Sequence, residues 1–378
     1  MPADALFIGL MSGTSLDGVD GVLARFSPQG HLQVLAHAFT PFADHFRAEL
    51  LQLNQSGPDE LHRAALAGNG IARHYAQVVQ ALLSQTGHAP EAITAIGAHG
   101  QTVRHRPLEF DGLPGQPAVG YTLQLNNPSL LAELSGIDVV ADFRSRDLAA
   151  GGQGAPLVPA FHQGVFGHAE HGVAVLNIGG ISNLSVLQPD GRVMGWDCGP
   201  GNALMDHWCQ LHTGQPFDRD GHWAASGQPS AVLLARLLSE SYLSQQPPKS
   251  TGRDLFNPAW LQQHLNELPE LPPQDIQATL TAFTAQACVR DVRHHAQGAQ
   301  RLIVCGGGAL NGHLMSLLAQ GLPGVQVVSS EQHGLPPLQV EAAAFAWLAF
   351  KAVRREPASL TSVTGARGAR VLGAIYPR

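Results

Sequence analysis

The sequence predicts an α/β protein made of two related halves, and three observations carry this prediction. The chain has 378 residues, which is too many for one ordinary hydrophobic core. Apolar runs of strand length alternate with segments of helical spacing, as is typical of α/β domains. A hairpin-like pattern over residues 7–23 recurs in weaker form over residues 173–187. We therefore expect a duplicated α/β fold with a cleft between two domains.

The first half contains most of the expected elements of one domain. After the hairpin, a third strand is expected at residues 31–39, and helices at residues 46–53 and 59–86. Further elements are a strand at 93–97, a surface excursion at 107–120, a helix at 130–134 and a strand at 138–141. The polar, glycine-rich segment 142–156 then breaks the pattern. We place the first domain at residues 1–141, completed by residues 338–378, and the second at residues 142–337.

The second half repeats the order of elements that opens the chain. Its hairpin is followed by a strand that ends just before Asp197, and then by helices and strands in alternation. The expected elements are helices at 203–212 and 272–296, a strand at 301–305, a helix to about 320, a strand at 325–329 and a helix at 338–354.

Composition and charge narrow the class of protein. Hydrophobic residues make up 44% of the chain, charged residues 13%, and the formal net charge is −7, which favours neither nucleic acid nor membranes as partners. No signal peptide is expected at the start, and the apolar run 342–350 is too short to span a bilayer. Four scattered cysteines indicate reduced thiols, and the 19 histidines lack metal-ligand spacing. We expect a cytoplasmic protein.

The turn of the first hairpin has the groups that a triphosphate needs. Glycines let the backbone approach an anion, hydroxyls donate to its oxygens, and Asp17 could hold Mg²⁺ through water. An ordinary hairpin turn is the alternative, because Asp-Gly is common there. The predicted nucleotide-binding residues of this turn are Gly13, Thr14, Ser15, Leu16, Asp17, Gly18, Val19 and Asp20.

Two further glycine clusters strengthen the interpretation as a nucleotide site. Gly179, Gly180 and Asn183 belong to the second hairpin, and Gly306, Gly307 and Gly308 lie between a strand and a helix. The third cluster matches a dinucleotide fingerprint poorly, and the chain has no Walker A sequence. We expect it to pack against a purine or ribose, with close helix–strand packing as the alternative.

Asp197 is the predicted general base. It lies between Trp196 and Cys198, where partial loss of solvent would raise its pKa towards the range that suits a base. Capping of the helix that begins near Ala203 is the alternative, although Asn202 is better placed for it. Candidate substrate ligands are His99, Gln101, Arg146, Asp147 and Glu341, each of which is by itself also explained as a surface or cap residue.

Several segments together resemble a known family. The two hairpin turns, the aspartate and the late glycine turn resemble the superfamily of acetate and sugar kinases, actin and heat-shock chaperones. Longer blocks resemble the anhydro-N-acetylmuramic acid kinases within it. These blocks are GLMSGTSLDGVD (Gly9–Asp20), AHGQT (Ala98–Thr102), VVADFRSRDLAAGGQGAPLVPAFH (Val139–His162), LNIGGISN, WDCGPGNALMD, FDRDGHWAASG (Phe217–Gly227), KSTGRDLFN (Lys249–Asn257) and VCGGGALN.

The resemblance implies an actin-like (ribonuclease H-like) fold and a kinase of peptidoglycan recycling. Such an enzyme uses ATP and water to convert 1,6-anhydro-N-acetylmuramic acid into N-acetylmuramic acid 6-phosphate and ADP. It implies Asp197 as the base, residues 13–20 at the triphosphate, and His99, Gln101, Arg146 and Glu341 around the sugar. It also implies a homodimer.

Three other functions remain open from the residues alone. They are a hydrolase that opens anhydro sugars without ATP, an actin-like or chaperone-like nucleotide-gated module, and a kinase for an ordinary sugar or acid.

Overall fold

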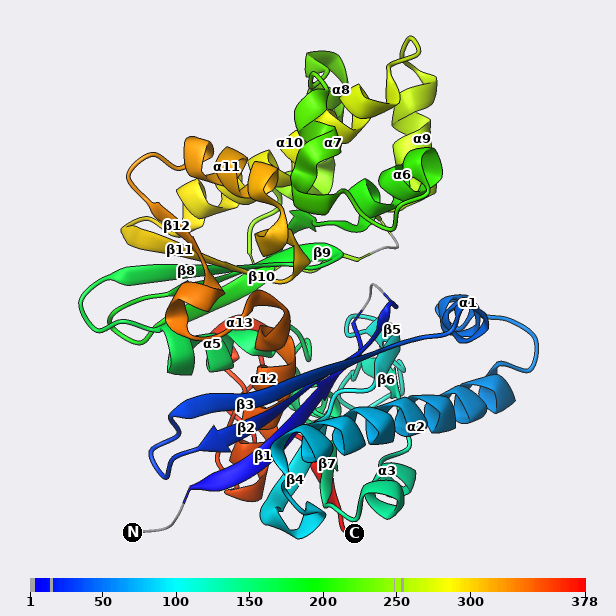
Figure 1. Cartoon of the computed structure of the whole chain (residues 1–378), viewed down its shortest axis with the longest axis vertical. Coiled ribbons are helices and arrows are strands. Elements are labelled where there is room, and N and C mark those ends of the chain that lie inside the picture. Colours follow the sequence, from blue (N-terminus) through cyan, green and yellow to red (C-terminus); the bar gives the residue numbers. More distant parts are fainter. Residues whose placement is uncertain (1–3, 14–15, 248, 253–254) are drawn as a thin grey trace. The chain divides into compact units, whose positions relative to one another are not determined.

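The computed structural model describes residues 4–13, 16–247, 249–252 and 255–378, which form two compact units (Figure 1). Unit 1 comprises Met1–Phe161 and Gln339–Arg378, and unit 2 comprises His162–Leu338. The first boundary between the two units therefore lies between residues 161 and 162, later than the boundary between residues 141 and 142 that we expected from the sequence. One reason is that the Asp147 carboxylate accepts a hydrogen bond of 2.9 Å from the Thr364 hydroxyl, which ties the segment after residue 141 to the C-terminal residues.

Unit 1 is built on a six-stranded mixed sheet. The first three strands of the chain, β1, β2 and β3, pair antiparallel in that order. β1 also pairs in parallel with β4. The strand order is β13-β7-β4-β1-β2-β3. The strands are β1 (Ala5–Met11), β2 (Gly18–Phe26), β3 (Leu32–Pro41), β4 (Ile93–Ala98), β7 (Val139–Ala141) and β13 (Ala374–Tyr376).

Helices cover both faces of this sheet. α2 (Glu60–Thr86) packs on one face, where Val78 and Leu82 contact the strands, and α12 (Val340–Val353) packs on the other. A side chain at Gly9 would place its Cβ atom 1.9 Å from the Ala342 carbonyl oxygen, so only glycine permits this approach of α12. The smaller helices of unit 1 are α1 (Asp44–Gln52), α3 (Pro128–Ser135), α4 (Ser145–Ala149) and α13 (Thr361–Thr364), and α5 (Val158–Phe166) begins in it.

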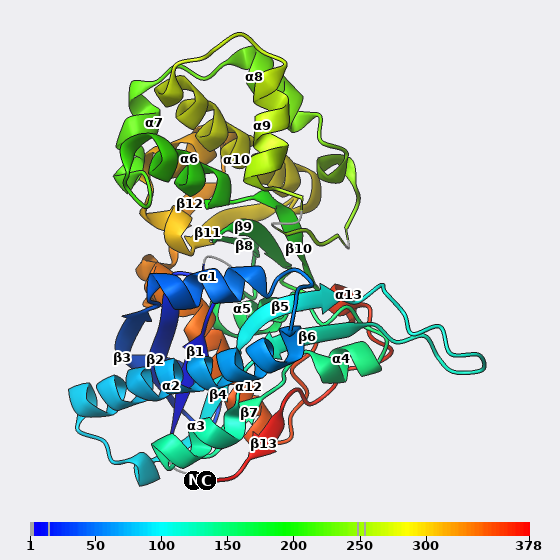
Figure 2. The same cartoon turned by 90° about the vertical axis from the view of Figure 1, so that its right-hand side faces the viewer.

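A two-stranded hairpin extends from unit 1. It consists of β5 (Gln101–Arg106) and β6 (Tyr121–Leu125), and the expected surface excursion is the long loop between them (Figure 2). Leu108 in this loop is 70% exposed, so the excursion contributes little to the core.

Unit 2 repeats the same strand order in a five-stranded sheet, β10-β9-β8-β11-β12. Its first three strands are again antiparallel, and β11 again pairs in parallel with the first. The strands are β8 (Gly172–Ile178), β9 (Ile181–Leu187), β10 (Val193–Pro200), β11 (Ala299–Cys305) and β12 (Gln326–Ser329). The repeated order confirms the predicted duplicated α/β fold.

One long helix forms the centre of the unit 2 core. α10 (Pro273–His295) packs Leu280 and Phe283 against Leu176, Leu184 and other apolar side chains of one sheet face. The other helices of unit 2 are α6 (Ala203–Thr213), α7 (His222–Ser226), α8 (Ala231–Leu238), α9 (Pro258–Asn266) and α11 (Gly312–Gly321). Short 3₁₀ turns lie at Pro90–Ala92, Arg219–Gly221, Ser241–Ser244, Gly307–Leu310, Ser330–His333 and Pro337–Gln339.

None of the helices in the described part of the chain has the length and apolar character that a bilayer-spanning helix requires. All four cysteines are buried and form no disulfide.

Candidate functional site

The first glycine turn joins β1 to β2 in unit 1. Leu16 has a left-handed backbone (φ 57°), and its N–H donates to the Gly13 carbonyl at 3.3 Å. The side chain of Leu16 is buried and that of Asp17 is exposed. Two of the predicted nucleotide ligands, Thr14 and Ser15, lie outside the described residues. The turn is therefore anchored by one apolar side chain and presents one carboxylate.

The other predicted residues of this turn belong to β2. A Cβ atom at Gly18 would lie 2.4 Å from the Thr40 carbonyl oxygen, so this glycine is required by strand packing. Val19 is buried in the core. Burial raises the pKa of Asp20, and a hydrogen bond of 3.0 Å from His37 opposes that rise. Gly18 and Val19 thus support the turn through packing.

The predicted sugar ligands His99 and Gln101 lie where β4 ends. The His99 N–H donates to the Leu10 carbonyl oxygen at 3.1 Å, and the Ser12 hydroxyl donates to the Gln101 side-chain oxygen. These bonds join the two residues to the first glycine turn. Glu341 is half-buried in the first turn of α12, and Phe345 one turn later packs on the His99 ring with centroids 4.6 Å apart.

Arg144 contacts His99, a relationship that the sequence did not indicate. Its Nε and Nη2 atoms lie 3.2 and 3.0 Å from His99 Nε2. Burial, and then the charge of Arg144, lower the pKa of His99 well below its ordinary value. The ring is therefore neutral, and Nε2 accepts from the guanidinium while Nδ1 carries the proton.

Arg146 and Asp147 were both predicted to contact substrate, but they occupy different environments. Arg146 is exposed on α4. Asp147 is fully buried, and its two carboxylate oxygens accept from Thr364 Oγ1 at 2.9 Å and from the Gly154 N–H at 2.8 Å. A buried carboxylate whose oxygens are already bonded to the protein supports the loop it holds. We therefore assign Asp147 a structural role in place of substrate contact.

In unit 2 the second and third glycine turns meet. A Cβ atom at Gly306 would lie 2.5 Å from Asn177 Oδ1, and one at Gly308 would lie 2.4 Å from the Ile178 side chain. Gly306 also has φ 76° and ψ −180°, a conformation that glycine alone adopts readily. Gly306 and Gly308 therefore pack directly against the end of β8, and a Cβ atom at Gly307 would lie 3.2 Å from Asn202 Nδ2.

The turn after β10 is fastened to the same place. The carbonyl oxygens of Gly179 and Gly180 accept from the N–H groups of Asn202 (2.7 Å) and Gly201 (3.0 Å). Asn202 occupies the N-cap position of α6, but its side-chain amide donates to the Ile178 carbonyl oxygen at 3.1 Å and caps nothing. The expected capping role of Asn202 is thus replaced by a link to β8.

Asp197 lies within β10, and not after its end as predicted. The strand continues to Pro200 with a register shift between Asp197 and Gly199. Neighbouring side chains on a strand point to opposite faces, so Trp196 and Cys198 enter the core while Asp197 faces away from it. These two neighbours therefore do not enclose the carboxylate, contrary to the premise of the sequence argument.

The side chain of Asp197 belongs to a polar row on that other face. Asp197 pairs with Asn183 on β9, and Asn183 pairs with Asn177 on β8. Directly opposed residues of antiparallel strands share a face. The row therefore combines one carboxylate and two amides at the end of the sheet where the glycine turns lie.

Tyr242, Ser250 and Thr251 supply donors to Asp197 that the sequence did not reveal. Ser250 Oγ and the Thr251 N–H both donate to Asp197 Oδ2 at 3.0 Å, and the Tyr242 hydroxyl donates to the Asp197 carbonyl oxygen at 2.8 Å. Hydrogen bonds to a carboxylate favour its ionised form, which a general base requires. Only the Ser-Thr pair in the block Lys249–Asn257 was a local sign of such donors.

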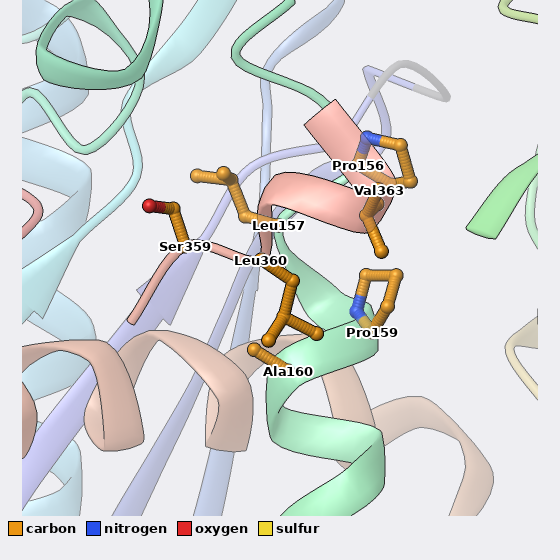
Figure 3. A pocket seen from close by; sticks show the side chains of 7 residues that line it. All are labelled: Pro156, Leu157, Pro159, Ala160, Ser359, Leu360 and Val363. Atoms are coloured by element: carbon orange, nitrogen blue, oxygen red, sulfur yellow. The ribbon is translucent and has the colours of Figure 1, made fainter. Parts of the chain in front are cut away.

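Two hollows in the surface lie apart from these residues. The first, in unit 1, has mostly apolar walls made by Leu157, Leu360, Val363 and their neighbours, and is too tight for a ligand (Figure 3). The second, in unit 2, has a volume of about 460 Å³ and is lined by Phe217, Asp218, Arg219 and Trp223 among others. Across the residues that the structure describes, no three His, Cys, Asp or Glu side chains are grouped as metal ligands.

The repeated strand order and the glycine turns at the strand ends define a duplicated actin-like, ribonuclease H-like fold. The sequence profile described as "Anhydro-N-acetylmuramic acid kinase" matches residues 5–378, and the chain belongs to this family. It is therefore a sugar kinase, a phosphotransferase.

Individual relatives agree with the family match over almost their entire lengths. The chain is 65% identical to the anhydro-N-acetylmuramic acid kinase of Variovorax paradoxus (99% of this chain, 100% of the relative). It is 57% identical to that of Albidiferax ferrireducens (98% and 99%). A solved structure, component A of (R)-2-hydroxyglutaryl-CoA dehydratase from Acidaminococcus fermentans, is similar over 93% of this chain and 98% of its own, with a TM-score of 0.48 and 13% identity. The fold assignment rests on the strand order.

Proposed function

We propose that this chain uses ATP and water to convert 1,6-anhydro-N-acetylmuramic acid into N-acetylmuramic acid 6-phosphate and ADP during peptidoglycan recycling. The family match supports the reaction, and the environment of Asp197 is the structural observation that carries the mechanism. Its carboxylate faces away from the core, accepts hydrogen bonds from Ser250 and Thr251, and shares a polar row with Asn183 and Asn177. Asp197 is the proposed general base.

The chemistry of the substrate explains why a base must act on water. A 1,6-anhydro sugar has no free 6-hydroxyl, so the bridge must open before O6 can accept a phosphoryl group. Asp197 takes a proton from water, whose oxygen bonds to the anomeric carbon as the bond from that carbon to O6 breaks. O6 then attacks the γ-phosphorus, and the bond from that phosphorus to ADP breaks. A positioned base contributes about 10²–10⁴-fold to such a rate.

Most of the remaining predicted residues have binding roles in this proposal, while Gly18, Val19 and Asp147 support the fold around the site. His99, Gln101, Arg146 and Glu341 contact the sugar, and Arg144 orients the His99 ring. The nucleotide is bound by Gly13, Leu16, Asp17, Asp20, Gly179, Gly180, Asn183 and Gly306–Gly308, with Thr14 and Ser15 included on the sequence alone. Backbone N–H groups in such turns suit phosphate oxygens.

The first glycine turn offers a carboxylate of the kind that Mg²⁺ takes as a ligand. The ion keeps several waters and needs only one or two carboxylates besides substrate phosphates, and Asp17 offers an exposed carboxylate there. When bound, Mg²⁺ neutralises charge on the phosphoryl oxygens. We also propose that the protein acts in the cytoplasm, as a homodimer.

An assay of ADP release tests this function. With ATP and Mg²⁺, we expect ADP only when 1,6-anhydro-N-acetylmuramic acid is added, in equal amount to the sugar phosphate formed. Ring opening without nucleotide would instead identify a hydrolase, and equal rates with an ordinary amino sugar would identify a different kinase. In ¹⁸O water the label should appear at the anomeric carbon, and label in the transferred phosphate would contradict the proposed order of bonds.

A further inference from the structure

Several described residues of unit 2 that are near one another in sequence bind the backbone and the carboxylate of Asp197. We call Tyr242, Leu243, Lys249, Ser250 and Thr251 the strap. Besides the donors from Tyr242, Ser250 and Thr251, the Asp197 N–H donates to the Lys249 carbonyl oxygen at 3.2 Å. The strap therefore binds the N–H, the carbonyl and one carboxylate oxygen of the same residue.

The strap is itself held by a buried ion pair. Lys249 Nζ lies 3.3 Å from Asp291 Oδ2, and the two side chains are only 1% and 5% exposed. The same ammonium group donates to the Leu243 carbonyl oxygen at 3.4 Å and lies 5.1 Å from the centre of the Tyr242 ring. One charge thus joins the two ends of the strap.

Asp291 also holds the strand that carries Asp197. It lies on α10, and its Oδ2 accepts from Trp196 Nε1 at 2.7 Å. Trp196 immediately precedes Asp197, with its side chain on the core face. A single carboxylate oxygen therefore fixes both the residue before Asp197 and the lysine that binds the backbone of Asp197.

We propose that Lys249 and Asp291 are positioning residues for the Asp197 carboxylate. The ion pair lies on the core side of β10, so it touches no substrate and acts only through Trp196 and the strap. A buried ion pair adds little stability over an apolar pair of similar volume, because desolvation offsets the attraction. Its directional contacts to both supports of Asp197 give it a function that an apolar pair lacks. This inference rests on the proposed role of Asp197 as the base.

A set of four variants tests the inference. Lys249→Met and Asp291→Asn should each destabilise the protein, because each leaves one buried charge without its counter-charge. The double variant K249M/D291N should recover most of the lost stability. Its kcat should nevertheless remain about 10- to 100-fold below wild type, with KM for sugar and ATP little changed, because the displaced base costs rate and not binding. Asp197→Asn, which lacks the proposed base, is the reference for a complete loss of its contribution to kcat.

Each outcome decides the inference. Full recovery of kcat together with stability in the double variant would show a merely structural pair and overturn it, even when Asp197→Asn is inactive. Normal turnover by Asp197→Asn would overturn both the proposed base and this inference. In the Asp197→Asn background, the double variant should lower kcat no further, because the carboxylate it positions is gone.

Tyr242→Phe provides a test that does not depend on the folding of the charge variants. It removes only the hydroxyl that binds the Asp197 carbonyl oxygen and keeps the ring against Lys249. We expect kcat to fall by about threefold to tenfold and the melting temperature to fall by only a few degrees, so that the variant stays folded. Unchanged kcat in Tyr242→Phe would contradict positioning through the strap.

Discussion

The guanidinium of Arg144 lies 3.0 Å from the Nε2 atom of a histidine, His99, that is 5% exposed. A cation and an imidazole approach this closely only when the ring is neutral, and burial together with the Arg144 charge lowers the pKa of His99 well below its usual value. The pair therefore presents a histidine of fixed tautomer and orientation.

Replacement of Arg144 by an uncharged residue should weaken sugar binding. In Arg144→Met the His99 ring loses the donor that orients it, and we expect the KM for the sugar to rise about tenfold. Burial remains the larger influence on the His99 pKa, so the ring should stay neutral at pH 7. Steady-state kinetics against Arg25→Met, whose guanidinium makes an exposed bond to Gln33, provides the matched control. Equal effects of the two variants would remove Arg144 from the site.

Replacement of the proposed base should abolish turnover but not binding. Asp197→Asn keeps the shape of the side chain and its acceptor oxygen, and removes the basic carboxylate. We expect kcat to fall by at least about a hundredfold. The affinities for sugar and nucleotide, measured by calorimetry, should match those of wild type. Asp190→Asn, an exposed aspartate of the same unit that pairs with Arg192, should have near wild-type kcat.

The third glycine turn should tolerate no side chain at Gly306. Alanine there combines an unfavourable backbone with contacts of 2.5 and 2.6 Å to Asn177 Oδ1 and the Ile178 carbonyl oxygen, which together cost about 2–6 kcal/mol. Gly324 is the control, because it has φ +88° but nothing within 4 Å of its Cβ position. Gly324→Ala should cost only about 1–2 kcal/mol. Denaturant unfolding measures both, and equal losses would refute the packing argument.

The free energy of unfolding should fall as the pH is lowered below 6.5, the pKa of an ordinary histidine. Burial lowers the pKa of His162 from 6.5 to about 3, so the unfolded chain binds a proton at pH values where the folded chain does not. Its stabilising contribution is complete above pH 6.5 and is lost between that value and about 3, by up to about 1.4 kcal/mol per pH unit.

The His162→Gln variant isolates this contribution. Its unfolding free energy should depend on pH less steeply than that of wild type between pH 6 and 4, by up to one proton. His45→Gln, on the exposed surface of α1, should leave the slope unchanged. Identical slopes for wild type and His162→Gln would show that His162 does not carry the effect.

The sequence predicted the elements whose pattern is strong and local. The hairpin strands, α2 and α10 lie close to their expected bounds because apolar spacing records which faces are buried. Gly199 and Pro200 concealed the true end of β10, since a glycine and a proline ordinarily mark a turn while here they follow a register shift within the strand. The glycine-rich segment 142–156 likewise concealed α4.

The candidate site was less accessible to sequence reasoning than the fold. Asp197 was identified by its residue type and its neighbours, but Thr251 binds it from 54 residues away in the chain and Asp291 supports it from helix α10. A lysine such as Lys249 is normally exposed, and no periodic pattern marks it as buried. Contacts between distant segments depend on the packed structure, which is also why the buried position of Asp147 was missed.

The close approach of α12 to Gly9 has a consequence for biosynthesis. Unit 2 is one continuous stretch of chain, so all of it has been synthesised once Leu338 has been added. Unit 1 has one face of its sheet without α12 until residues 340–353 emerge, although its strands β1–β4 are made first. Domains generally fold as units during synthesis. The half of the enzyme that begins the chain is therefore the half that finishes folding last, and a nascent chain carries an open apolar sheet face until α12 arrives.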